Sequence, residues 1–225
     1  MFISVAHNYM EIIDKDYLSV NEYFNNLYQR ELSIKTKQQI KKVHKQIWIL
    51  LIWKNTLKIE YLLYDDILQD MLSIIKTIPL KDVKIINFLI RNISENFIRV
   101  YSFKHHLDIS DSTQPAKIFS TIYSNIKNDF EHENFRDIHN IYKQTCSYVH
   151  SAKLANSIYR CLKDYEGNVN DSIIDKLICD LLHLIKKINN ILLINHKSNF
   201  EKINLDYQSI IRDFMDKKDL KVFGY

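Results

Sequence analysis

Glycine and proline are scarce in this chain of 225 residues, which contains only two of each. Sandwiches, barrels and nucleotide-binding α/β folds depend on many tight turns and use far more of both residues. The sequence also has no glycine-rich loop of the kind that cradles nucleotide phosphates. These shortages exclude turn-rich architectures and NTP hydrolysis at such a loop, and they favour long helices.

Cysteine and long apolar runs are scarce as well. The three cysteines, Cys146, Cys161 and Cys179, are odd in number and form no metal-like pair, so we expect no secreted disulfide framework. The first residues have neither a basic leader nor a long apolar run, so we expect no signal peptide. Its most apolar window, residues 47–53, is far shorter than the roughly 20 residues of a membrane span. We therefore expect a cytoplasmic protein without a membrane segment.

Apolar and aromatic side chains are abundant and follow helical spacing. Hydrophobic residues make up 46% of the chain, which is enough to build one all-α domain over residues 1–225. In residues 10–31 they recur at steps of three and four and predict one buried helical face. That face comprises Ile13, Tyr17, Val20, Phe24, Leu27 and Tyr28.

The same periodicity, with cap and stop signals, predicts an irregular bundle of about seven helices. Pro79 ends a long pattern that can break near Tyr64 or Asp65, the polar stretch 108–115 is a loop, and the polar stretch 130–135 leads into a later helix. The predicted helices span residues 10–31, 33–78, 80–107, 115–128, 135–164, 172–195 and 200–217.

Two places break the pattern of apolar and charged faces. Arg91 and Glu95 stand at i and i+4, with Asn92 beside them. On a later helix Tyr142, Cys146 and His150 follow at steps of four. An ordinary ion pair and a core histidine are the alternative explanations. The other histidines lack zinc spacing, so we expect no metal and no cofactor.

These motifs, R-N-x-x-E-N and Y-x-x-x-C-x-Y-V-H-S, resemble those of divergent HEPN-type domains of prokaryotic toxin, CRISPR and phage-defence proteins. The resemblance covers residues 80–197 and leaves residues 1–79 as an N-terminal helical extension. The family's usual signature places a histidine four to six residues after the arginine on one helix. Here the arginine would come from a separate helix, which leaves a non-catalytic relative as an alternative.

The resemblance implies metal-independent cleavage of RNA. His150 would take the proton from a ribose 2′-hydroxyl, and Arg91 would stabilise the charge that grows on the attacked phosphate. Glu95 would orient Arg91. Hydrogen bonds to the scissile phosphate would come from Asn92, Ser147 or Tyr148.

Partners follow from charge and from the resemblance. The net charge of +4 permits an anionic partner. A basic stretch is the best candidate for contacting an RNA backbone, although a solvated helix face explains each lysine as well. The resemblance further implies a homodimer that builds one cleft from two copies. Two alternatives stay open. One is a non-catalytic helical subunit that binds nucleic acid or another defence protein, for example a toxin or a reverse transcriptase. The other is a peptide-binding adaptor with an exposed apolar groove. The RNA-binding candidates are Lys35, Lys37, Lys41, Lys42, Lys45 and Lys153.

Overall fold

Helices account for nearly all of the regular structure. The computed structural model describes residues 3–29, 31–109, 114–150, 171–213, 215 and 217–224, with side chains from residue 11 onward except those of 147–150. Within these residues there is no strand, which confirms the predicted all-α class. The elements are α1 (Ile3–Tyr28), α2 (Ile34–Leu57), α3 (Leu62–Thr77), the 3-10 helix η1 (Ile78–Leu80), α4 (Val83–Lys104), α5 (Pro115–Asn125), α6 (Asp129–His150), α8 (Asp171–Asn195), α9 (Lys197–Phe200), α10 (Leu205–Asp213) and α11 (Lys217–Val222).

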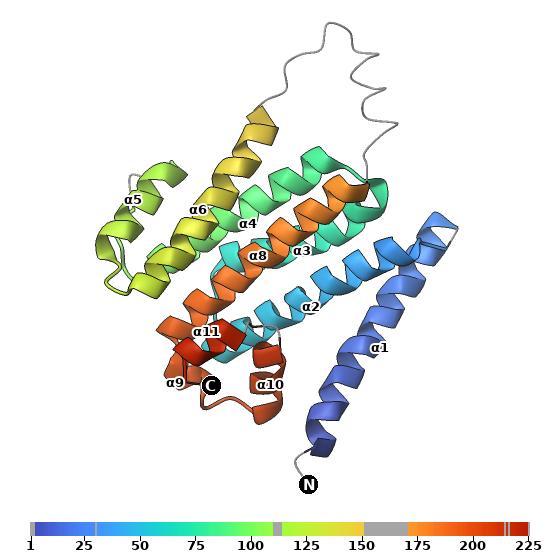
Figure 1. Ribbon diagram of the computed structural model, residues 1–225, viewed down its shortest axis with the longest axis horizontal. Coiled ribbons are helices and arrows are strands. Elements are labelled where there is room, and N and C mark those ends of the chain that lie inside the picture. Colours follow the sequence, from blue (N-terminus) through green and yellow to red (C-terminus); the bar gives the residue numbers. More distant parts are fainter. Residues whose placement is uncertain are drawn as a thin grey trace, which may run out of the picture.

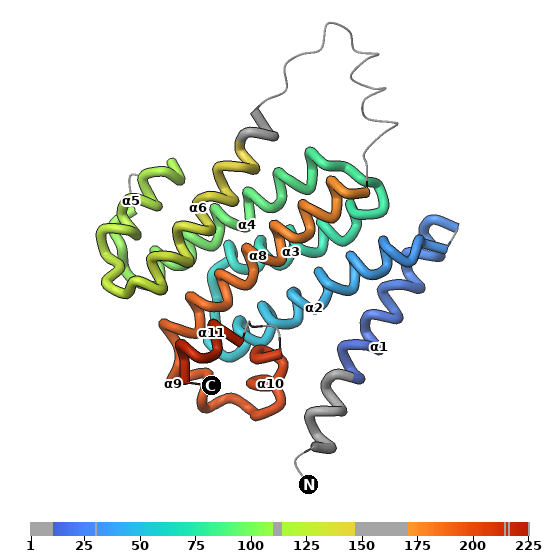
Figure 2. Tube along the Cα trace, viewed as in Figure 1, coloured from blue at the N-terminus to red at the C-terminus, as the bar shows by residue number. Residues whose placement is uncertain are grey.

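Five long helices, α2, α3, α4, α6 and α8, form the body of the bundle (Figure 1). Each packs against the next in the order α2, α3, α4, α6 and α8, and α8 closes the arrangement by returning to α2. Helix α5 lies outside α4 and α6, while α9 to α11 gather at one end of the bundle. Helix α1 forms a V with α2 at the edge of the molecule (Figure 2).

The apolar stripe of α4 shows why the bundle assembles. Asp82 caps this helix by accepting a hydrogen bond of 2.9 Å from the backbone N–H of Ile85. Farther along, Ile90, Ile93 and Phe97 are buried against the neighbouring helices. Each such side chain contributes about 1.5–3 kcal/mol by leaving water. Their spacing of three and four residues puts all three on the side of α4 that faces the bundle.

The long pattern over residues 33–78 breaks earlier than predicted. Helix α2 ends at Lys58, which takes a left-handed conformation with φ 49°. Tyr64 lies inside α3, where it is buried and donates a hydrogen bond of 2.9 Å to the carbonyl of Leu50. The predicted break near Tyr64 or Asp65 was therefore misplaced, because a lysine, not glycine or proline, makes the turn.

Two more expectations need correction. Helix α6 begins at Asp129, because Asn128 accepts a hydrogen bond of 3.0 Å from the N–H of Glu131, so residues 130–135 are helical. The C-terminal segment predicted as one helix is divided among α9, α10 and α11. The described residues consequently hold ten α-helices in place of about seven. Leu27, predicted on the buried face of the first helix, is exposed.

Candidate functional site on helices α4 and α6

Helices α4 and α6 run antiparallel, and three contacts fix how they are aligned. The hydroxyl of Tyr101 donates to Glu131 at 3.0 Å, and the rings of Phe97 and Phe135 lie 6.1 Å apart. Closer to the start of α4, the Arg91 guanidinium lies over a tyrosine ring of α6. Moving backward along α4 therefore corresponds to moving forward along α6 toward His150.

Arg91 is held by one residue from each helix. Its Nε donates to Oε1 of Glu95 at 2.7 Å, and its Cζ lies 5.8 Å from the centre of the Tyr142 ring. Both members of the ion pair are mostly shielded, with side-chain exposures of 22% and 20%. A guanidinium over an aromatic face gains a cation–π attraction. The contact therefore fixes both the position and the orientation of the positive charge.

The protonation states around Arg91 follow from its neighbours. Burial alone would lower the pKa of Arg91, but the hydrogen bond and charge of Glu95 outweigh it and raise the pKa. Burial raises the pKa of Tyr142 to about 12, and its hydrogen bond with Cys146 acts in the same direction. At neutral pH the site thus holds a permanent cation and a protonated phenol.

The structure brings Arg91, Glu95, Tyr142 and Cys146 together, and it gives the predicted histidine a backbone position. His150 follows Tyr142 by two helical turns, about 12 Å along the axis of α6. By the antiparallel alignment this places its backbone level with the start of α4, whereas Arg91 lies eight residues into α4.

Some of the predicted site residues lie outside the part of the chain that the structure describes. The side chains of Ser147, Tyr148 and His150 lie outside the described side chains, and Lys153 lies outside the described residues. Asn92 is half-buried on α4 next to Arg91. The pairing of Arg91 with His150 therefore stays a prediction. Sequence spacing had placed Tyr142 on the same face as His150 without assigning it a contact to the arginine.

Five of the six predicted RNA-binding lysines lie on α2, and several have carboxylate partners. Helix α8 lies between α2 and α6, so this surface is separate from the Arg91 site. Lys42 and Lys45 add positive charge there, and their charges help to lower the pKa values of Asp175 and Asp14, respectively. The surface is therefore mixed in charge. The ion pairs are Lys35 with Asp175 at 2.5 Å, Lys41 with Asp14 at 2.8 Å, and Lys37 with Glu31.

A second polar cluster at the other end of α4 and α6 was missed by sequence reasoning. Glu131 is buried and accepts hydrogen bonds from Tyr101 at 3.0 Å and from Nδ2 of Asn195 at 2.5 Å. The His105 ring stacks on Tyr101 at 4.2 Å, and burial lowers the pKa of His196 to about 4. Because the fold itself supplies the donors to Glu131, the cluster has a structural role. Its members come from three distant segments, so no local pattern could reveal it.

The described residues include neither a cluster of side chains that could bind a metal nor a helix that could cross a membrane. No group of three or more His, Cys, Asp and Glu side chains there could hold a metal ion. None of the helices in that part of the chain is long and apolar enough to cross a membrane. Comparison with protein families, with curated proteins and with solved structures finds no match for this chain.

Proposed function

We propose that this protein is a metal-independent endoribonuclease, or an RNA-binding effector, of a prokaryotic toxin or antiphage defence system. It would act in the cytoplasm as a homodimer with an HEPN-like core over residues 80–197. One observation supports the proposal: Arg91 of α4 is fixed by Glu95 and packs on Tyr142 of α6, the helix that also carries His150. The two motifs of the resemblance thus belong to neighbouring helices.

The chemistry uses a base and a cation. His150 takes the proton from the ribose 2′-hydroxyl, and the freed oxygen attacks the adjacent phosphorus. The Arg91 guanidinium stabilises the negative charge that develops on the phosphate oxygens, because it stays protonated and is already oriented by Glu95. The bond to the 5′-oxygen breaks and that oxygen takes up a proton from water, which leaves a 2′,3′-cyclic phosphate and a 5′-hydroxyl. Asn92, Ser147 or Tyr148 donates to the phosphate.

The positions of Arg91 and His150 in one chain are the reason for placing each cleft between two copies. The backbone of His150 lies about 12 Å along α6 from that of Tyr142, the residue on which Arg91 packs. A catalytic base and a phosphate-binding cation must both reach one scissile group. A second copy that sets the end of its α6 against the α4 face of the first would shorten this separation. We therefore assign the two residues of each cleft to different copies.

The decisive experiment is RNA cleavage in the presence of EDTA. Wild type, Arg91→Ala and His150→Ala are incubated with total RNA, and Arg136→Ala serves as the matched control. Arg136 is an exposed arginine on α6 that is 3.7 Å from Glu133, so its loss removes a charge without touching the site. We expect cleavage to fall about 10²–10⁴-fold in the two site variants and to stay unchanged in the control.

Further readouts separate the alternatives. New 5′ ends that accept phosphate from a polynucleotide kinase identify the 5′-hydroxyl product. A mixture of Arg91→Ala and His150→Ala should regain roughly a quarter of wild-type activity if each cleft draws on two copies, because half of the dimers are mixed and hold one intact cleft. Equal cleavage in all variants indicates a contaminant. RNA binding without cleavage leaves the effector role.

A non-catalytic helical subunit of a defence complex is the second candidate, and the lysines of α2 favour it. Lys35, Lys37 and Lys41 each pair with a carboxylate of this chain. Phosphate binding would have to displace those carboxylates, which weakens the case for an RNA surface there. Absence of both RNA cleavage and RNA binding in the same assay would select this candidate.

A further inference from the structure

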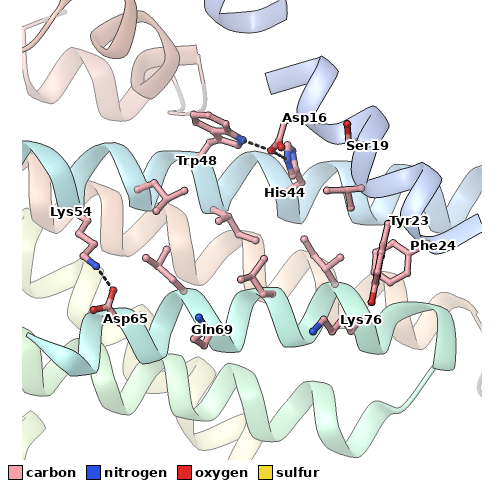
Figure 3. A pocket seen from close by; sticks show the side chains of 16 residues that line it. Asp16, Ser19, Tyr23, Phe24, His44, Trp48, Lys54, Asp65, Gln69 and Lys76 are labelled. Carbon is pink, nitrogen blue, oxygen red and sulfur yellow. Dashed lines mark hydrogen bonds and ion pairs between the residues drawn. The ribbon is translucent and has the colours of Figure 1, made fainter. Parts of the chain in front are cut away.

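A groove of about 630 Å³ lies between α1, α2 and α3, away from α4 and α6 (Figure 3). Its floor is apolar, with Ile47 and Leu51 from α2 and Leu68 and Ile75 from α3. Apolar side chains also remain exposed at its edges, since Leu72 of α3 is 42% exposed and Tyr23 of α1 is 53% exposed. Exposed apolar surface gathered in one groove is typical of a binding site.

The shape of the groove suits a helix. Each wall is a helix that contributes side chains at steps of three and four, for example Leu68, Leu72 and Ile75 on α3. The groove extends along α3 from Asp65 to Lys76, twelve residues that span about 16 Å, or three turns of a helix. An amphipathic helix meets such walls with residues at i, i+3 or i+4, and i+7. A fourth helix in this place would complete a small bundle.

Polar groups mark the two ends and the middle (Figure 3). Lys54 and Asp65 form an ion pair at one end. At the other end Lys76 is exposed, and within the described residues no carboxylate pairs with its ammonium. The exposed side chain of Gln69 lies between them. The Lys76 end of the groove thus carries a positive charge and complements a helix with an acidic side chain there, whereas the Asp16 carboxylate elsewhere in the lining is hydrogen-bonded by His44 and Trp48.

We propose that this groove binds an amphipathic α-helix of a partner protein, with leucine-like side chains on the floor and a carboxylate at Lys76. An amphiphilic small molecule fits less well, because a pocket for such a ligand encloses most of its surface, whereas this groove is open along α3. The proposal goes beyond RNA cleavage. It concerns a different surface and holds whether or not the Arg91 site is active.

Trp48 provides a direct probe of occupancy. Its indole lines the groove, and its Nε1 donates to Oδ2 of Asp16 at 3.1 Å, so its environment in the free protein is fixed. The only other tryptophan, Trp53, is buried in the core and donates to Asn189 at 2.5 Å. A change in fluorescence that disappears in Trp48→Phe therefore reports on the groove alone.

Three synthetic helical peptides serve as ligands. The first has leucines at i, i+4, i+7 and i+11 with glutamate at one end, the second has lysine in place of that glutamate, and the third has the same composition with the leucines scattered around the helix. We expect the first to change Trp48 fluorescence with a Kd in the micromolar range and the scattered peptide to bind at least tenfold more weakly.

Two variants of the protein localise the binding. Leu72→Glu places a carboxylate at the edge of the groove and should weaken binding of the first peptide at least tenfold. Leu62→Glu is the matched control, because Leu62 is 79% exposed on the same helix and does not line the groove. Lys76→Glu should exchange the preference, so that the lysine peptide binds more tightly than the glutamate peptide. Thermal unfolding checks that all three variants fold.

Several results would overturn the proposal. One is an equal response to the scattered peptide, or no Trp48 response to any peptide at about 1 mM. Another is tight binding of dodecanoate at Trp48 without binding of the peptides, which would make the groove a small-molecule site. A third is a dimer that Leu72→Glu converts to monomers in sedimentation, which would make the occupant a second copy. RNA cleavage is measured on the same variants and should not change.

Discussion

Asp70 on α3 allows a quantitative test of the electrostatics of this fold. Its side chain is half-buried, and burial together with the negative charge of Asp66 raises its pKa from 3.8 to about 6. At neutral pH the folded protein must hold an ionised carboxylate in a place that disfavours it. Asparagine has nearly the same shape and no charge. We therefore predict that Asp70→Asn stabilises the protein at pH 7.

The magnitude and its sign follow from the shift in pKa. Because the pKa of Asp70 is higher in the folded state, its favourable contribution is complete below pH 3.8 and is lost as the pH rises through about 6. The rise in pKa from 3.8 to about 6 corresponds to about 3 kcal/mol in the absence of screening. Because the side chain is partly exposed, we expect about 1–2 kcal/mol at pH 7.

The assay is urea unfolding of wild type and Asp70→Asn between pH 4 and pH 8. We expect their difference in unfolding free energy to be near zero at pH 4 and to reach a plateau above pH 7. Asp66→Asn is the control and should give a smaller gain, because it removes the weaker of the two causes. A difference that is independent of pH, or a loss of stability at pH 7, would refute the reasoning.

Three further tests, with four substitutions, concern the interior. Asn190→Ala and Asp219→Ala should each lower the free energy of unfolding, measured with urea, by about 2–3 kcal/mol. In a double-mutant cycle they should couple by more than about 0.5 kcal/mol, because Nδ2 of Asn190 donates a hydrogen bond of 3.0 Å to the buried carboxylate of Asp219. Additive losses would contradict that contact. Burial and nearby positive groups lower the pKa of His196 to about 4, so its protonation favours the unfolded state. His196→Gln should therefore lessen the fall in unfolding free energy between pH 6.5 and pH 4. An unchanged pH profile would contradict this expectation. Tyr64→Phe should cost about 1 kcal/mol by removing its hydrogen bond to Leu50, and a neutral result would show that the bond contributes nothing.

Helical periodicity was sufficient to predict the all-α class but not the number or the exact bounds of the helices. The stripe around Ile93 and Phe97 became core because spacing at three and four determines which side of a helix is buried. Spacing could not locate the turn at Lys58, because a left-handed lysine leaves no local signal. It also misplaced the start of α6. The acidic Glu131 looks like a loop residue until distant donors satisfy its carboxylate.

The candidate site was only partly accessible from the sequence. The pair of Arg91 and Glu95 followed from their i and i+4 spacing and forms as predicted. The contact between Arg91 and Tyr142 depends on how α4 and α6 align, which no short motif encodes. The counter-charges on the α2 lysines were equally hidden. Lys35 meets Asp175, which is 140 positions farther along the chain.

The docking of α8 on α2 has a consequence for biosynthesis. Trp53 and Asn189, joined by a hydrogen bond inside the bundle, are 136 residues apart in the chain. At about 5–20 residues per second a ribosome needs roughly 7–27 s to travel from one to the other. During that interval α8, which covers α2 in the folded protein, has not yet been made, so the apolar side chains of α2 are exposed to chaperones or to other nascent chains. Molecules that misassemble should therefore do so before α8 emerges.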